Sequence, residues 1–136
     1  MRTIFILSLM FVANIADTQN KLTVVVDGIE KSTGKIVVAV SDSINFQKKS
    51  LYYGMIKVEP KQEEVTIVIE NIASGKYAVS LYHDENDNNK LDTGSYGIPV
   101  EKYGFSNNAK GKMGPPAFQN CMIIIKEDTE INITLQ

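Results

Sequence analysis

Residues 63–84, "EEVTIVIENIASGKYAVSLYHD", decide the predicted fold of this chain. In the first half of this stretch, Val65, Ile67 and Ile69 fall on one face and mostly polar residues fall on the other. The second half, residues 75–84, alternates in the same way after a turn at Gly75. A period of two is typical of a β-strand that buries one face, so the stretch predicts two antiparallel strands joined by a tight turn.

Tyr77 stands two residues after Gly75, at the start of the second predicted strand. This Gly-x-Tyr spacing resembles a corner that is common in immunoglobulin-like and transthyretin-like sandwiches, where the tyrosine hydroxyl bonds back to the turn. We therefore predict that Tyr77 is a structural anchor rather than a catalytic residue.

Short segments of the same kind make up most of the remaining chain. Residues 21–29 and 35–42 are rich in β-branched residues, and residues 121–128 and 130–136 form the last two predicted strands. No segment carries a convincing helical period, although residues 43–53 could form one or two helical turns. The expected class is all-β: a single antiparallel β-sandwich, immunoglobulin-like or transthyretin-like.

Residues 92–120 interrupt this rhythm with five glycines and three prolines. A loop of this length in a compact domain is more often functional or tightly ordered than idle. Its aromatic and aliphatic residues predict an ordered excursion that covers one end of the sandwich. We expect Tyr103 and Phe105 to pack under the preceding acidic segment; the alternative is an exposed aromatic platform, beside Asn107 and Asn108, for a sugar or a peptide.

Residues 1–16 have the layout of a secretory signal peptide. Arg2 precedes an apolar stretch over residues 4–15, and Ala16 is a small residue after which cleavage can occur. The stretch is shorter than the roughly 20 apolar residues of a membrane span; an N-terminal core strand is the alternative. We expect an exported protein, periplasmic or secreted, in which residues 17–136 form the β-sandwich domain without a transmembrane segment.

Charge and cysteine content narrow the classes of protein further. Residues 17–136 carry 13 basic and 16 acidic groups, and the lack of a lysine- or arginine-rich run argues against nucleic acid as a partner. Cys121 is the single cysteine, so there is no internal disulfide and burial must stabilise the fold. Because Cys121 lies in an apolar segment, we expect a buried, inert thiol.

The segment "HDENDNNKLD", residues 83–92, is the best candidate for a functional site. Counted from its first aspartate, oxygen-bearing side chains fall at positions one, three, five and nine, as in the EF-hand type of calcium loop. The candidate ligands are the side chains of Asp84, Asn86, Asn88 and Asp92 and the backbone carbonyl of Lys90. Because Ca²⁺ takes six to eight oxygen ligands, an all-oxygen set favours this ion.

Three features separate this segment from a complete EF-hand. Position six, which must turn sharply, is Asn89 instead of glycine, and position twelve is Ser95 instead of a bidentate glutamate. The flanks are strand and coil rather than helices. The missing ligand must come from elsewhere, and Glu101 is the nearest downstream acid. The alternative without a metal is an Asx-rich turn, since Asn and Asp side chains bond to their own backbone in loops.

Three ordered motifs in the second half of the chain resemble those of the bacterial family known as domain of unknown function 2141. They read "HDENDNNKLD" at 83–92, "GIPVEKYGFSNNA" at 97–109 and "GPPAF" at 114–118. The resemblance extends over residues 22–135 and implies an exported bacterial β-sandwich. Where the family tends to have glycine, this chain has Asp87 and Asn89. No activity is known for the family, so the resemblance implies no catalytic residue.

Two hypotheses of different classes follow. The first is a non-enzymatic binding or accessory module of the bacterial envelope with a calcium-stabilised loop, whose partner is an envelope protein or a carbohydrate. The second is a small secreted hydrolase or carbohydrate-active enzyme that uses the loop carboxylates. His83 is the only histidine and no G-x-S-x-G motif occurs, so we assign no catalytic residue. A structural subunit of the envelope is a third interpretation.

Overall fold

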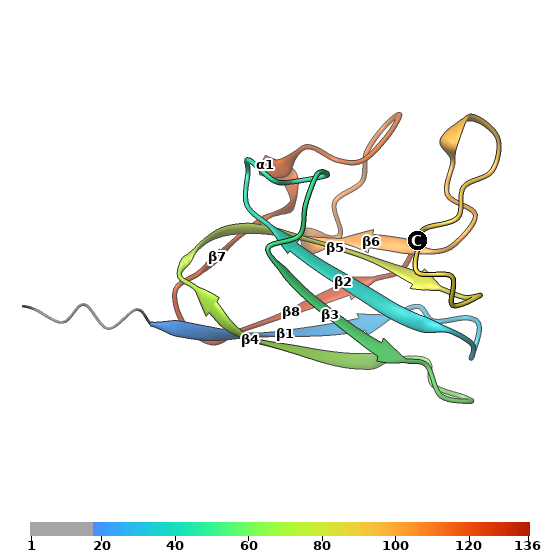
Figure 1. Cartoon of the computed structure of the whole chain (residues 1–136), viewed down its shortest axis with the longest axis horizontal. Coiled ribbons are helices and arrows are strands. Elements are labelled where there is room, and N and C mark those ends of the chain that lie inside the picture. Colours follow the sequence, from blue (N-terminus) through green and yellow to red (C-terminus); the bar gives the residue numbers. More distant parts are fainter. Residues whose placement is uncertain (1–17) are drawn as a thin grey trace, which may run out of the picture.

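The computed structural model describes residues 18–136 and shows two β-sheets packed face to face (Figure 1). The signal peptide expected at residues 1–16 lies outside the described residues. The first sheet has the order β4–β1–β8 and the second β3–β2–β5–β6, with β7 on the same edge of β5 as β6. The strands are β1 Gln19–Asp27, β2 Lys35–Ser41, β3 Tyr52–Lys57, β4 Val65–Ala73, β5 Gly75–Asp84, β6 Tyr103–Phe105, β7 Met122–Ile125 and β8 Thr129–Thr134.

The expected all-β class is confirmed, and one pair of strands departs from the antiparallel pattern. β1 pairs antiparallel with β4 but parallel with β8, with Leu22 opposite Thr129. β7 pairs antiparallel with β5 in the second sheet, and the short turn after it brings the chain into the first sheet. Because of this crossover, β8 runs in the same direction as β1.

The core consists of the inward-facing residues of both sheets. Leu22, Val24 and Val26 of β1 are fully buried, as are the alternate residues Ile36 and Val38 of β2. A fully buried aliphatic side chain contributes about 1.5–3 kcal/mol relative to an exposed one. Alternation therefore fixes which face of each strand turns inward, because a shift of one residue would expose the whole set.

The turn between β4 and β5 is fixed by two tyrosines. The Tyr77 hydroxyl donates a hydrogen bond to the carbonyl of Ala73 at 2.7 Å, and the amide of Ala73 donates to the Tyr52 hydroxyl at 3.1 Å. The two rings pack edge to face with centroids 5.8 Å apart. The predicted structural role of Tyr77 is therefore confirmed.

Two strands were not expected from the sequence. Residues 52–57 form β3, whose first two residues fall in the segment 43–53, for which one or two helical turns were the possible alternative. Gly54 lets this strand approach Ile67 and Ile69 of the other sheet, because a Cβ would lie 3.0 Å from Ile67. β6 joins the sheet where Gly104 leaves room for Ile133, 2.7 Å from where its Cβ would lie. Both glycines thus mark close contact between the sheets.

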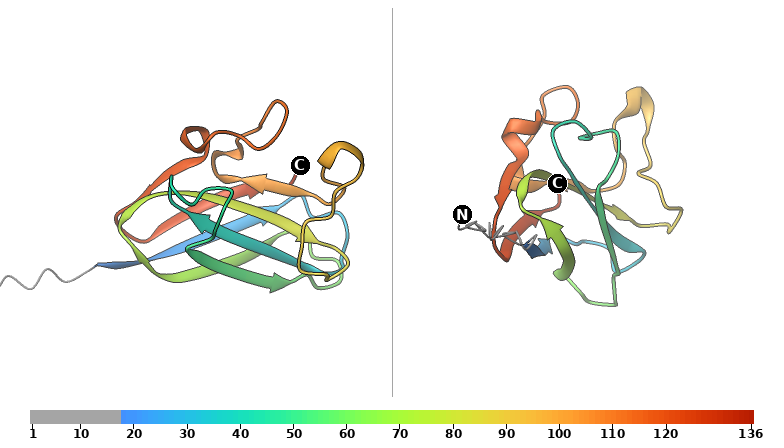
Figure 2. Two further views of the ribbon diagram at one scale, coloured as in Figure 1. Left: turned by 45° about the horizontal axis from the view of Figure 1, so that its top comes forward. Right: turned by 60° about the vertical axis from the view of Figure 1, so that its left-hand side comes forward.

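The excursion over residues 92–120 is ordered, but it does not close one end of the sandwich. It contains β6, the 3₁₀ turns Ser95–Gly97 and Ser106–Asn108, and the helical turn α1, Phe118–Cys121. Its centre pairs with β5, so the excursion follows the edge of the second sheet and projects two loops from it (Figure 2). Cys121 at its end is fully buried, and this burial raises the pKa of the thiol, as expected for an inert cysteine.

Within residues 18–136, no helix has both the length and the apolar content needed to cross a membrane.

Candidate functional site

Asp84, the last residue of β5, anchors the candidate loop. Its side chain is fully buried, although a carboxylate is rarely buried without partners. The partners are backbone amides of the loop itself: Oδ1 accepts from the amide of Asn88 at 3.0 Å and Oδ2 from the amide of Asn89 at 2.8 Å. The chain after β5 is therefore wound around one carboxylate.

The middle of the loop depends on two residues in the left-handed region. Asp87 has φ 59° and Asn89 has φ 65°, which L-residues adopt at a cost and Asn and Asp tolerate best. The sharp turn predicted at Asn89 is confirmed. A second such turn at Asp87 lies at the other position where the sequence resemblance pointed to glycine.

Asp92 closes the loop through two asparagine side chains. The Asn86 amide nitrogen donates to Asp92 Oδ2 at 2.6 Å, and the Asn88 amide nitrogen lies 2.8 Å from Oδ1 and 3.0 Å from Oδ2. Hydrogen bonds from Asn88 and then Asn86 hold the pKa of Asp92 below its usual value, because they stabilise the charged form. Residues at loop positions three, five and nine are thus brought together.

Glu101 ties the two ends of the loop to each other. Its side chain is only 6% exposed; Oε1 accepts from the amide of Glu85 at 3.0 Å, and Oε2 accepts from the amide of Asp92 at 2.9 Å. Glu101, the nearest downstream acid in the sequence, therefore does lie at the loop. Lys90 is exposed there, and its amide donates to the Asn88 side chain at 3.2 Å.

Lys35 also contacts the candidate loop, although nothing in the sequence indicated this residue. It starts β2 directly opposite Asp84, and its ammonium lies 2.6 Å from Asp87 Oδ1, 2.5 Å from Asn89 Oδ1 and 3.7 Å from Asp84 Oδ2. The hydrogen bond to Asp87 raises the pKa of Lys35 against the opposing effect of desolvation. A cationic group thus already contacts three oxygens of the loop.

Within residues 18–136, no three His, Cys, Asp or Glu side chains are grouped in a way that could hold a metal ion. The carboxylates of Asp84 and Glu101 each face backbone N–H groups instead of each other. Each of their oxygens nevertheless has a second lone pair, since an ionised carboxylate can accept about four hydrogen bonds. The donor set is therefore compatible with an oxygen-ligated cation, once the asparagine amides present oxygen in place of nitrogen.

The remaining candidates from the sequence have structural contacts. His83 is buried, and its Nε2 lies 2.7 Å from the carbonyl of Thr33; because a carbonyl only accepts, Nε2 carries the proton. Phe105 is buried and Tyr103 is half-buried. Asn107 donates to the carbonyls of Asn120 and Met122, so it braces the backbone and is not placed beside an aromatic platform.

A hollow of about 420 Å³ lies beside the end of β1, and no residue of the loop 84–92 lines it. Its lining residues are Asp27, Gly28, Ile29, Glu30, Glu63, Glu64, Lys102 and Leu135. Lys102 donates to Glu30 at 2.8 Å, and this contact lowers the pKa of Glu30. A general acid that works near neutral pH needs a raised pKa, so Glu30 is not suited to that role.

These features define an all-β sandwich domain with a polar, self-bonded loop at the end of a central strand. The chain belongs to the bacterial family described as "Uncharacterized protein conserved in bacteria (DUF2141)", which matches residues 24–133. Comparison with curated proteins and with solved structures found no match.

Proposed function

We propose that this protein is an exported, non-enzymatic binding module of the bacterial envelope, and that residues Asp84–Asp92 bind Ca²⁺. The single observation that carries the metal proposal is a loop at the spacing of a calcium loop, in which the backbone winds around the buried Asp84 and the side chains of Asn86 and Asn88 meet at Asp92. The proposal of export rests on the sequence of residues 1–16, and that of an envelope protein or carbohydrate as partner on the class of the fold.

Ca²⁺ would be held by the side chains of Asp84, Asn86, Asn88 and Asp92 and by the carbonyl of Lys90. Glu101 supports this set in two ways: it fixes the backbone at both ends of the loop, and each of its oxygens, which accepts one hydrogen bond in the structure, has a second lone pair. The ion would supply a positive charge that cross-links the loop, with no role in bond cleavage.

Binding is expected to be weak. Both ligand carboxylates, those of Asp84 and Asp92, already accept hydrogen bonds, and the Lys35 ammonium opposes a second cation. Sites with few acidic ligands lie toward dissociation constants of about 0.1–1 mM. At 5 mM Ca²⁺ this corresponds to about 1–2 kcal/mol of stabilisation, or a rise in Tm of about 4–9 °C.

Calorimetric titration and thermal unfolding of residues 17–136 with Ca²⁺ test the proposal. The Asp92→Asn variant should lose most of the heat and most of the Tm shift, because it removes a ligand charge while keeping the side-chain size. The matched control is Asp128→Asn, which removes an exposed acid that bonds to the amide of Lys21. Absence of both heat and a Tm shift at millimolar Ca²⁺ in the unaltered protein would refute the metal site.

A further inference from the structure

Three segments project from the same side of the sandwich. Residues 43–51 connect β2 to β3, residues 93–100 precede β6, and residues 106–120 connect β6 to β7. Figure 1 and the right-hand view of Figure 2 show all three along the upper side of the molecule, and in the left-hand view of Figure 2 this side is turned toward the viewer. We refer to these three segments together as the loop face.

The loop face exposes large apolar side chains at separate tips. Tyr96 and Met113 are fully exposed, and Ile44 is 75% exposed. Ile98 and Val100, beside Tyr96, are each about two-thirds exposed. Single exposed apolar residues are ordinary, but their concentration on one side of a protein marks an interaction surface.

These tips are displayed by an ordered base. Phe46 packs edge to face against Phe105 and Phe118, with centroids 6.3 and 5.8 Å apart, and so joins two of the segments over a small second core. Asp42 fixes the first segment by accepting from the amides of Ile44 and Asn45 at 3.1 and 2.9 Å. The apolar side chains of these two segments therefore stay exposed although the segments themselves are anchored.

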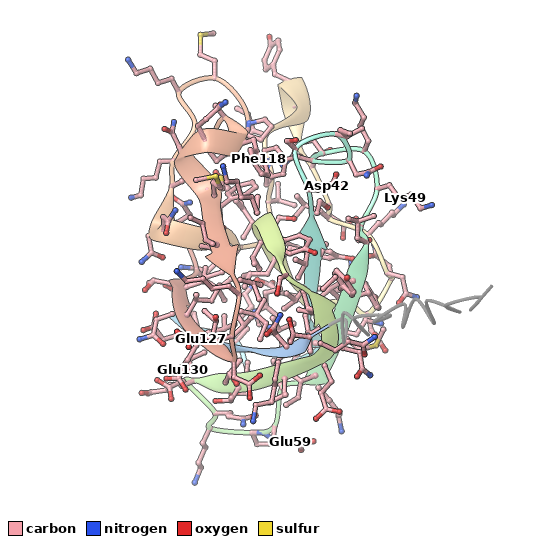
Figure 3. All side chains as sticks on the ribbon, turned by 90° about the vertical axis from the view of Figure 1, so that its left-hand side faces the viewer. Asp42, Lys49, Glu59, Phe118, Glu127 and Glu130 are labelled. Atoms are coloured by element: carbon pink, nitrogen blue, oxygen red, sulfur yellow. The ribbon has the colours of Figure 1, made fainter. Side chains whose placement is uncertain are left out.

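The same segments carry a one-signed charge. They contain Lys48, Lys49, Lys110 and Lys112 and no acidic residue. The rest of residues 17–136 is left with 9 basic and 16 acidic groups, a formal charge of −7. Figure 3 shows Lys49 at the same end as Phe118, together with Asp42, which directly precedes the first segment, and it shows Glu59, Glu127 and Glu130 at the opposite end. A positive face on an acidic protein indicates an anionic partner.

We propose that the loop face docks onto the surface of an anionic lipid bilayer. Aromatic and aliphatic side chains at separate tips can enter the interface between headgroups and acyl chains, while the lysines lie among anionic headgroups. An acidic protein would also match the charge of the loop face. A bilayer surface, however, deforms around the apolar tips of three separate segments and covers them more evenly than a single protein surface would.

The acidic loop does not cancel this attraction. Asp92 lies four residues before Tyr96 in a short hairpin in which Thr93 pairs with Pro99 and the amide of Val100 bonds to Asp92. At about 3.3 Å per residue, the tip can extend about 13 Å from Asp92, which exceeds the screening length of about 8 Å at physiological salt. The inference is therefore independent of calcium binding by the loop.

Flotation of residues 17–136, which include every strand of both sheets, with lipid vesicles tests the proposal in the presence of a chelator. Vesicles of phosphatidylethanolamine and phosphatidylglycerol should bind the protein at physiological ionic strength, and vesicles of phosphatidylcholine should bind it at least tenfold more weakly. The Lys110→Gln, Lys112→Gln variant should bind about 30-fold more weakly, at about fivefold for each lysine. The control Lys21→Gln, Lys126→Gln removes the same charge elsewhere and should change binding less than threefold.

The apolar contribution is tested separately. Met113→Ser should weaken vesicle binding severalfold. Val68→Ser changes an exposed residue of β4, away from the loop face, and should leave vesicle binding unchanged. Three results would overturn the proposal: no binding to anionic vesicles, equal loss in both lysine double variants, or vesicle binding that Met113→Ser leaves unchanged. A dimer in sedimentation that Met113→Ser dissociates, without vesicle binding, would instead assign the face to a second copy of the chain.

Discussion

Replacing Glu101 with glutamine should release both ends of the loop. In the structure one carboxylate accepts from two backbone amides, those of Glu85 at 3.0 Å and Asp92 at 2.9 Å. Glutamine keeps the shape of the side chain but offers only one acceptor oxygen. Its amide nitrogen must then face one of the two backbone N–H groups, donor against donor.

The cost follows from burial. Because Glu101 is 6% exposed, water can replace the lost acceptor only if the loop opens. Losing one charge-assisted hydrogen bond and leaving one buried N–H unsatisfied costs about 1.5–3 kcal/mol. For a domain of this size, 2 kcal/mol corresponds to a Tm lowered by about 8 °C and to amide exchange about 30-fold faster at the affected sites.

Hydrogen exchange followed by NMR on the unaltered protein and the Glu101→Gln variant measures this at single residues. The amides of Glu85 and Asp92 should lose protection first, while those of β1 and β4 should follow only the global stability. Glu127→Gln, at an exposed turn, is the control and should change stability by less than about 0.5 kcal/mol. If the two amides exchange at unchanged rates and Tm stays within about 1 °C, Glu101 does not clamp the loop.

Three further predictions concern single groups. The Lys35→Met variant should bind Ca²⁺ about tenfold more tightly than the unaltered chain. The Lys35 ammonium is 3.7 Å from Asp84 Oδ2, and hence at most about 6 Å from an ion bound to that oxygen. At this distance the repulsion between the ammonium and Ca²⁺ is about 1.4 kcal/mol in water. Lys57→Met, one strand further away, should bind Ca²⁺ as the unaltered chain does. Carbon-13 NMR should find the pKa of Asp92 in the folded protein below the ordinary 3.8. The stabilisation that the Asp92 carboxylate provides is then complete above pH 3.8 and is lost as the pH falls through the lowered pKa. The Asn88→Ala variant should raise the pKa of Asp92 again. Burial raises the pKa of Tyr77 to about 12, so its contribution is complete below pH 10 and lost as pH rises toward 12. Alkaline unfolding followed by circular dichroism should therefore be less steep over that range in Tyr77→Phe.

The amino-acid sequence was sufficient to predict features that depend on neighbouring residues. The alternation of residues 63–84 predicted strands β4 and β5, because a period of two assigns each side chain to a face regardless of the partner strand; that the two strands belong to different sheets follows only from the structure. The Gly75-x-Tyr77 spacing gave the corner, since donor and acceptor are four residues apart. The polar spacing of residues 84–92 likewise indicated a tight loop, in which the side chains of Asn86, Asn88 and Asp92 meet.

Where a feature depends on distant partners, only the tertiary structure decided it. Lys35 reaches Asp84 because β2 and β5 pair in a register that places them opposite each other, and nothing near Lys35 in the sequence indicates that register. β3 and β6 were missed because each contains a glycine, which weakens a strand signal, and the sheets use those glycines for close contact. The loop face has the same origin: three segments far apart in sequence share a side only because the strands between them pack as they do. Local patterns fix which way a side chain turns, whereas pairing and packing fix what it meets.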